Sequence, residues 1–189
     1  VINKDSFFEI CDELGILVWQ EFPLACNRYE GTEAYISVLK KEAEAIIERI
    51  KEHVCLMLWC GGNELFNNWS CMTDQDKAIR LMDKLTFEKT PEIPFLPTSP
   101  VMGMAHGPYN FNMSDGGEVI EALQKSRNTG YTEFGGGGFS TKETLFQIAD
   151  ISELKPLNLE NEIAVAHGTH ALSLETERYF GKITDFDKL

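Results

Sequence analysis

Basic side chains are scarce in this chain. Its 189 residues include 17 lysines and arginines against 30 aspartates and glutamates, a net charge of −13 at pH 7. Nucleic acids and anionic membrane surfaces attract positive proteins, so this charge argues against both as partners. The chain also lacks any apolar run close to the ~18 residues that a membrane-spanning helix needs. A neutral substrate such as a sugar is compatible with the charge, although the charge does not select it.

Paired cysteine motifs are missing as well. The five cysteines are odd in number and never have CxxC spacing, which disfavours a zinc ribbon or a dithiol redox centre. Most lie in apolar or strand-like segments, so we expect buried, reduced thiols at Cys11, Cys26, Cys55, Cys60 and Cys71. His167 and His170 have a spacing that could face a metal ion, but no further ligand completes a set, and no metal site is expected.

What the chain does contain is a regular alternation of helical and strand-like segments. Helical periodicity predicts helices at 5–14, 32–53, 74–87, 115–126 and 141–153. Short apolar runs predict strands at 16–19, 54–59, 93–96 and 130–134, with a weaker one within 104–111. Beyond residue 154 the pattern fades, with an ambiguous segment at 163–167 and a helix-like one at 173–181. The alternation is typical of an α/β fold with a parallel sheet.

A closed (β/α)8 TIM barrel needs eight strands, and the chain supplies four or five. It is therefore either part of a barrel or a smaller open α/β sheet, and the pattern alone does not separate the two. No repeat, low-complexity tract or linker-like run marks a second domain, so we expect residues 1–189 to form a single domain.

Two glutamates stand at Gly-rich turns beside predicted strands. Glu64 follows Gly61, Gly62 and Asn63, and Glu133 lies in an aromatic strand before four glycines. Carboxylates at the ends of parallel strands are what glycoside hydrolysis needs, one to protonate the leaving oxygen and one to attack the sugar. The alternatives are that Glu64 caps the next helix or is merely exposed, and that Glu133 forms a structural ion pair.

The glycine run at 135–138 offers a different reading, an α/β enzyme that binds phosphate. No GK[ST] or GxGxxG frame accompanies it, so the indication is weak.

Aromatic and hydrogen-bonding residues near these glutamates are candidate sugar contacts. The indoles of Trp19, Trp59 and Trp69 lie near strand ends, where they could stack on a sugar ring or pack in the core. An ionised Glu133 needs donors, and Tyr131 and His106 are candidates, although His106 could equally be an ordinary loop histidine.

Several segments resemble glycoside hydrolase family 2 enzymes. FFEICDELGILVWQEFPLAC (7–26) is similar to their strand-3 region, LWCGGNE (58–64) to their strand-4 motif, and TEFG (132–135) to their strand-7 SEFG or SEYG. HGTHALSLETERYFG (167–181) is similar to the segment after that strand. PTSP (97–100) resembles the PSSP of the β-mannosidase branch.

The resemblance implies a partial TIM barrel, roughly strands 3 to 7, from a retaining exo-β-glycosidase without a cofactor. Glu64 would be the acid/base, Asn63 its hydroxyl-binding neighbour and Glu133 the nucleophile. After PTSP the branch usually has Asp-x-His-x-Trp, whereas this chain keeps His106 and has Tyr109 but lacks the Asp and Trp. GGGG also replaces the usual Phe-Gln-Ser after the nucleophile. Sugar specificity is thus open, and β-galactosidase or β-glucuronidase of the same family are alternatives. A non-catalytic carbohydrate-binding barrel is a further alternative.

The same resemblance implies that strands flanking this segment in the family are absent. A piece of a barrel leaves strand edges unpaired, which favours self-association. We therefore expect little or no activity from the chain by itself.

Overall fold

The computed structural model describes residues 2–136, 140–156, 160–166, 177–179 and 181–182. The chain divides into two compact units. The first comprises Val1–Ala105 with Asn128–Thr132, and the second comprises His106–Arg127 with Glu133–Leu189. The expectation of a single domain over residues 1–189 stays a prediction.

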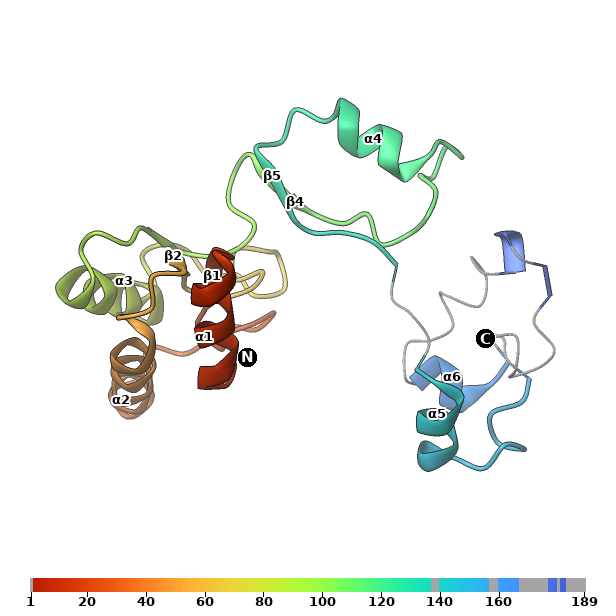
Figure 1. Cartoon of the computed structure of the whole chain (residues 1–189), viewed down its shortest axis with the longest axis horizontal. Helices are drawn as coiled ribbons and strands as arrows, with labels where there is room; N and C mark the ends of the chain where they lie inside the picture. Colours follow the sequence, from red (N-terminus) through yellow and green to blue (C-terminus); the bar gives the residue numbers. More distant parts are fainter. Residues whose placement is uncertain (1, 137–139, 157–159, 167–176, 180, 183–189) are drawn as a thin grey trace. The chain divides into compact units, whose positions relative to one another are not determined.

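The first unit is built from alternating helices and parallel strands (Figure 1). Its elements are α1 (Asp5–Leu14), β1 (Val18–Glu21), α2 (Glu33–Ile50), β2 (Leu56–Cys60), α3 (Lys77–Lys89) and β3 (Phe95–Leu96). The three strands are parallel and lie in the order β1-β2-β3, so consecutive strands are neighbours. The predicted α/β class with a parallel sheet is confirmed.

Helix α2 forms over the longest segment of helical periodicity. The Thr32 side chain caps its first turn by accepting a hydrogen bond from the Tyr35 backbone N–H. One stripe is buried, formed by Leu39, Ala43, Ile47 and Ile50. This stripe joins the main core, and α2 packs against α3 (Figure 1). Helix α1 ends at Gly15, which adopts the left-handed conformation (φ 68°) that glycine tolerates best.

The strand pairing continues beyond the regular strands. Isolated parallel bridges join Ala25 to Asn63 and Asn63 to Ser99, so the three segments that follow β1, β2 and β3 stay side by side. Residues that follow the strands therefore collect at one end of the sheet. This is the carboxyl end, where parallel α/β folds place their binding residues.

Five further elements follow β3 among the described residues. They are β4 (Met104–His106), α4 (Val119–Lys125), β5 (Gly130–Glu133), α5 (Lys142–Ile148) and α6 (Glu162–Ala166). Strands β4 and β5 pair, and hydrogen bonds join Gly103 to Thr129, Gly107 to Glu133 and Pro108 to Gly135. Because the partners advance together along both segments, this pair is parallel. In the second unit Leu145 and Leu154 form a small apolar cluster with Ala149 and Ile163.

Sequence-based boundaries differ from the structure mainly where the signal was weak. The strand expected within 104–111 ends at His106, and the helix expected at 141–153 ends at Ile148. The ambiguous segment at 163–167 is helical through Ala166. Most of the helix-like segment at 173–181 lies outside the described residues. No described helix is long and apolar enough to cross a membrane.

The expectation of five buried thiols is wrong for two cysteines. All five are free, and Cys11, Cys55 and Cys60 are buried, but Cys26 and Cys71 are exposed. Both exposed residues lie in loops after β1 and β2 and have positive φ angles of 47° and 52°. Loops run over the surface because their backbone polar groups need water.

Candidate active site

Glu64 lies at the carboxyl end of the sheet in the first unit. Its backbone N–H donates to the Ser99 carbonyl (2.7 Å), and its own carbonyl accepts from the Ser70 hydroxyl (2.9 Å). Its φ of 54° is unusual for a residue other than glycine, and such conformations often occur at functional sites. Helix α3 begins only at Lys77, after the N-cap residue Asp76, so the alternative that Glu64 caps a following helix is wrong.

The two glycines before Glu64 are required by close backbone approach. A Cβ atom at Gly61 would lie 2.3 Å from the Pro97 carbonyl oxygen, and one at Gly62 would lie 2.3 Å from the Leu24 carbonyl oxygen. Gly62 also has a φ of 150°. The glycines thus let the loops after β1 and β3 approach the chain that carries Glu64.

The Glu64 carboxylate contacts the thiol of Cys26, and the same thiol contacts the Asn63 amide. Cys26 Sγ donates to Glu64 Oε2 (3.4 Å), and Asn63 Nδ2 donates to Cys26 Sγ (3.4 Å). The predicted neighbour Asn63 therefore belongs to the same group of side chains. Cys26 was not singled out by the sequence as a site residue, although its position in the loop after β1 was the available signal.

Glu133 lies at the end of β5, and its hydrogen-bonded neighbours belong to the second unit. The Tyr109 hydroxyl donates to Glu133 Oε2 (2.8 Å), and His106 Nδ1 lies 3.5 Å from Glu133 Oε1. His106 was an expected neighbour, whereas the phenol donor seen here is that of Tyr109 rather than that of the expected Tyr131. Hydrogen bonds of this kind stabilise an ionised carboxylate. The His106 contact is also compatible with the structural ion pair left open above.

Trp59 is a core residue. Its side chain has no exposed surface, stacks on Phe22 (ring centroids 5.4 Å apart) and donates from Nε1 to the Thr90 hydroxyl (3.0 Å). The expectation that Trp59 contacts a sugar is therefore wrong, because β2 turns this side chain toward the helices.

Trp19 lies on the other face of the sheet. It pairs in register with Leu58, while Trp59 pairs with Gln20, and neighbouring residues of a strand point to opposite faces. Trp19 is half-buried, and its indole nitrogen has no oxygen or nitrogen partner among the described residues. It touches the thiol of Cys60, a weak acceptor; burial raises the pKa of this thiol to about 12. Trp69 is exposed.

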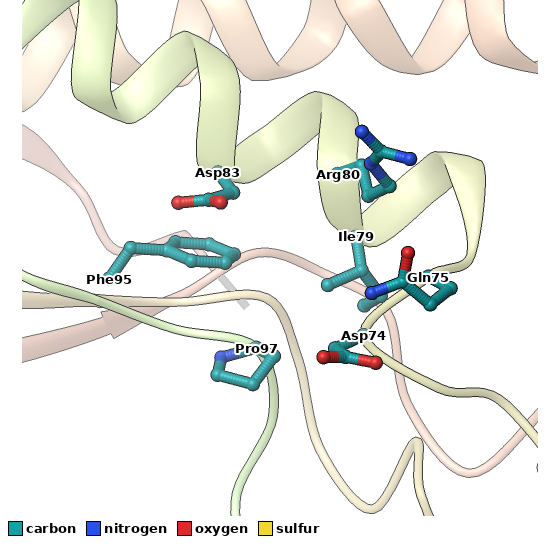
Figure 2. A pocket seen from close by; sticks show the side chains of 7 residues that line it. All are labelled: Asp74, Gln75, Ile79, Arg80, Asp83, Phe95 and Pro97. Atoms are coloured by element: carbon teal, nitrogen blue, oxygen red, sulfur yellow. The ribbon is translucent and has the colours of Figure 1, made fainter.

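A cavity of about 350 Å³ lies elsewhere in the first unit (Figure 2). Ile79, Arg80 and Asp83 of α3 border one side, and Phe95 and Pro97 border the other, with Asp74 and Gln75 at its rim. None of the candidate site residues lines it. The cavity lies on the helix side of β3 and not at the Glu64 loop, so it does not form the candidate active site.

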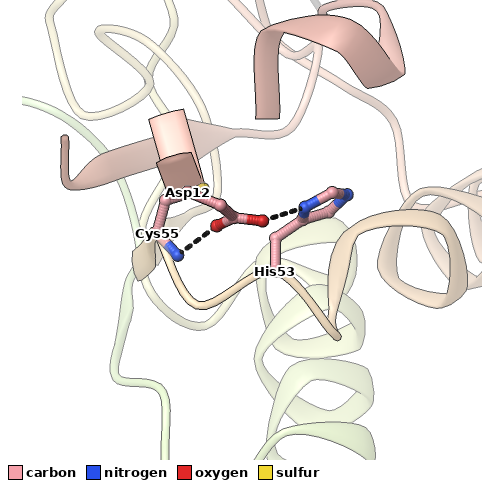
Figure 3. A group of neighbouring side chains, drawn as sticks. All are labelled: Asp12, His53 and Cys55. Atoms are coloured by element: carbon pink, nitrogen blue, oxygen red, sulfur yellow. Dashed lines mark hydrogen bonds and ion pairs between the residues drawn. The ribbon is translucent and has the colours of Figure 1, made fainter. Parts of the chain in front are cut away.

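A group of side chains with potential metal ligands consists of Asp12, His53 and Cys55 (Figure 3). One ligand atom from each lies within 4.8 Å of the others. Asp12 Oδ2 is 2.6 Å from His53 Nδ1, and Asp12 Oδ1 accepts from the Cys55 backbone N–H (2.7 Å). Burial raises the pKa of the Cys55 thiol to about 12, whereas a metal ligand must be a thiolate. The group therefore fits a structural hydrogen-bond cluster that ties α1 to the start of β2.

This chain is similar to several known β-mannosidases, and each match covers only a short part of the β-mannosidase. Over an aligned length of 137 residues the chain is 28% identical to the β-mannosidase of Mus musculus, and the match covers 61% of this chain and 16% of that protein. Over an aligned length of 118 residues it is 32% identical to the β-mannosidase of Rattus norvegicus, and the match covers 55% of this chain and 13% of that protein. Over 64 residues it is 38% identical to the β-mannosidase of Capra hircus, and the match covers 34% of this chain and 7% of that protein. No family model matches the chain.

Solved structures show the same likeness in the fold. A β-D-mannosidase from Dictyoglomus thermophilum matches all of this chain and 25% of its own with a TM-score of 0.71 and 24% identity. An FMN-binding β-glucuronidase from Facaelibacterium prausnitzii L2-6 matches 74% of this chain and 24% of its own, with a TM-score of 0.52 and 18% identity. The chain is therefore a homologue of the β-mannosidases, which are glycoside hydrolases, and it spans about one sixth or less of the curated relatives described above.

Proposed function

We propose that this chain forms the central part, roughly strands 3 to 7, of the (β/α)8 barrel of a retaining β-mannosidase-like exo-β-glycosidase. Its homology to β-mannosidases supports the reaction class. The sheet order supports the architecture, because neighbouring strands that follow one another along the chain are typical of a barrel, whereas a doubly wound sheet reverses its order. The observation that carries the proposal is the position of Glu64 at the carboxyl end of this sheet.

In the proposed reaction the two glutamates act in turn. Glu64 donates a proton to the glycosidic oxygen while the Glu133 carboxylate attacks the anomeric carbon, which releases the aglycone and forms a glycosyl-enzyme ester. Glu64 then takes a proton from water, whose oxygen attacks the anomeric carbon and frees Glu133. The Tyr109 hydroxyl donates to the Glu133 carboxylate and His106 Nδ1 lies 3.5 Å from it, so these two side chains would orient the proposed nucleophile.

Substrate recognition is proposed for five further side chains. The Asn63 amide is placed to bind a sugar hydroxyl beside Glu64, and Trp19 offers an indole on the face of the sheet away from the helices. His106 and Tyr109 contact Glu133 directly, and Tyr131 lies two residues before it on β5. The proposed substrate is a neutral carbohydrate, consistent with the acidic chain.

Site-directed variants of the complete gene product test the two roles. Glu133→Gln should abolish release of the aglycone from aryl β-mannosides, because the uncharged amide cannot form the ester. Glu64→Ala should slow hydrolysis, and added azide should partly restore the rate. Azide is a small nucleophile that attacks the glycosyl-enzyme without help from a base. Glu118→Gln, an exposed control, should leave the rate unchanged. Turnover that survives Glu133→Gln would contradict the proposal.

The chain by itself is proposed to have little or no activity, since it spans a small part of its relatives. The comparison is aryl β-mannoside hydrolysis by the 189-residue chain and by the complete gene product at equal molarity. Matching rates would refute this part of the proposal. Mannoside binding that is unchanged by Glu133→Gln, without turnover in either protein, would instead favour a non-catalytic carbohydrate-binding barrel.

A further inference from the structure

Cys26 occupies an unusual position next to Glu64. The parallel bridge between Ala25 and Asn63 sets the residues that follow, Cys26 and Glu64, at neighbouring points of the sheet end. The Cys26 N–H donates to the Asn63 carbonyl (3.0 Å), and the Asn63 N–H donates to the Leu24 carbonyl (2.8 Å). Cys26 and Glu64 both have left-handed φ angles, of 47° and 54°. Each such residue costs about 1–2 kcal/mol, so surrounding contacts must hold this conformation.

The Cys26 side chain connects the two residues to which the proposed function gives roles. Its S–H donates to Glu64 Oε2, and its sulfur accepts from Asn63 Nδ2, each at 3.4 Å. Thiol hydrogen bonds are weak individually, but these two fix the carboxylate and the amide relative to one another through a single atom. A side chain without a polar atom at residue 26 would remove both contacts at once.

The same thiol is open to reagents. Cys11, Cys55 and Cys60 are buried, so Cys26 and Cys71 are the exposed cysteines of the chain. The Cys71 thiol donates to a backbone carbonyl, that of Asn68 (2.6 Å), which makes Cys71 an internal comparison. The Glu64 carboxylate accepts the S–H of Cys26, so a change at Glu64 should change how this thiol meets an electrophile.

We propose that Cys26 is a positioning residue for Glu64 and that covalent modification of its thiol inactivates the site by displacing the carboxylate. The inference rests on the proposed function for its catalytic consequence, but the coupling between the thiol and Glu64 does not. The class of ligand is a small thiol-directed electrophile. With methyl methanethiosulfonate, the Cys26 thiolate attacks the sulfenyl sulfur, a methyl disulfide forms, and methanesulfinate leaves with the electron pair of the broken S–S bond.

The coupling is measured by labelling the 189-residue chain in a Cys71→Ser background, so that Cys26 is the reactive exposed thiol. Glu64→Gln should raise the labelling rate about threefold to tenfold, because the carboxylate that accepts the Cys26 S–H is gone. Asn63→Ala should lower it, because the amide that donates to sulfur is gone. Glu30→Gln, an exposed change in the same loop region, should leave the rate within twofold. Equal rates in all variants would overturn the coupling whether or not the protein is a glycosidase.

The catalytic consequence is measured as kcat/KM of the complete gene product on two mannosides. Cys26→Ala should lower kcat/KM for an alkyl mannoside at least tenfold more than kcat/KM for a 2,4-dinitrophenyl mannoside. The alkyl leaving group needs a proton donor, whereas the dinitrophenolate does not. Cys26→Ser, which keeps a donor, should restore most of the loss. Equal slowing of both substrates, or none, would overturn the positioning role. If Glu64→Ala has no effect on either substrate, the proposed function fails, while the labelling result still decides the coupling.

Discussion

At the scale of single residues, glycines and tryptophans carry the most direct consequences for folding. Residue type predicted that Gly61 and Gly62 allow a sharp turn, and the structure adds the backbone oxygens that they approach. Residue type did not decide whether Trp59 is a core or a cleft residue. Indole serves both roles, and the outcome depends on which face of β2 meets the helices, a tertiary property that the short run Leu58-Trp59-Cys60 does not encode.

Removing Trp59 should strongly destabilise the first unit. Trp59→Ala deletes a fully buried ring that stacks on Phe22, and such changes cost about 3–5 kcal/mol. Trp19→Ala, on the less buried face, should cost clearly less. Urea unfolding followed by far-UV circular dichroism compares the two. Equal losses would mean that Trp59 does not anchor the core.

Adding one methyl group at Gly62 should also destabilise the fold. Gly62→Ala combines a positive φ with a Cβ atom 2.3 Å from the Leu24 carbonyl oxygen, so we expect a loss of about 2–4 kcal/mol. Gly15→Ala is the matched control, since Gly15 has a positive φ but open space around its Cβ position. This control should cost only about 1 kcal/mol. A smaller loss at Gly62 than at Gly15 in urea titrations would contradict the steric argument.

At the scale of elements, helix periodicity and caps predicted α1 and α2 well. The apolar stripe of α2 and its Thr32 cap are local signals, so they can be read without knowing the fold. The contact of Asp12 with His53 and the Cys55 N–H could not be predicted, because 41 and 43 residues separate the partners. The same limit explains why Cys26 was not recognised beside Glu64, 38 residues away.

Anchoring of α1 through Asp12 should make stability depend on pH. Hydrogen bonds from the Cys55 thiol and from His53 hold the pKa of Asp12 below its ordinary 3.8. A lowered folded-state pKa gives stability that is full above pH 3.8 and is lost as the pH falls through the folded-state value. Asp12→Ala should therefore lower the urea midpoint at about pH 6, and the difference from the unchanged chain should shrink at about pH 2–3.

Glu13→Ala, the next residue on the exposed side of α1, serves as the control for helix propensity. Its midpoint should stay close to that of the unchanged chain at both pH values. A pH-independent effect of Asp12→Ala would show that its charge does not anchor the helix.

At the scale of the whole molecule, the sheet of the first unit has exposed apolar residues beside its first strand. Among the described residues β1 pairs with β2 only, and Ile16 and Leu17 just before it are 51% and 66% exposed. Unpaired strands with apolar neighbours favour association between copies. We expect the average mass in sedimentation velocity to rise with concentration, and Leu17→Lys to reduce this rise. Ile120→Lys, an equally exposed change on α4, should not. A concentration-independent monomer would refute this expectation.

The central proposal is that Glu64 and Glu133 act as the acid/base and the nucleophile of one glycosidase site. A crystal structure of the complete gene product with a bound mannoside analogue measures the separation of the two carboxyl groups directly. The account predicts about 5–5.5 Å, the separation in retaining glycosidases. A separation of about 9 Å would indicate an inverting mechanism instead, and one well beyond about 10 Å, outside both ranges, would contradict the pairing altogether.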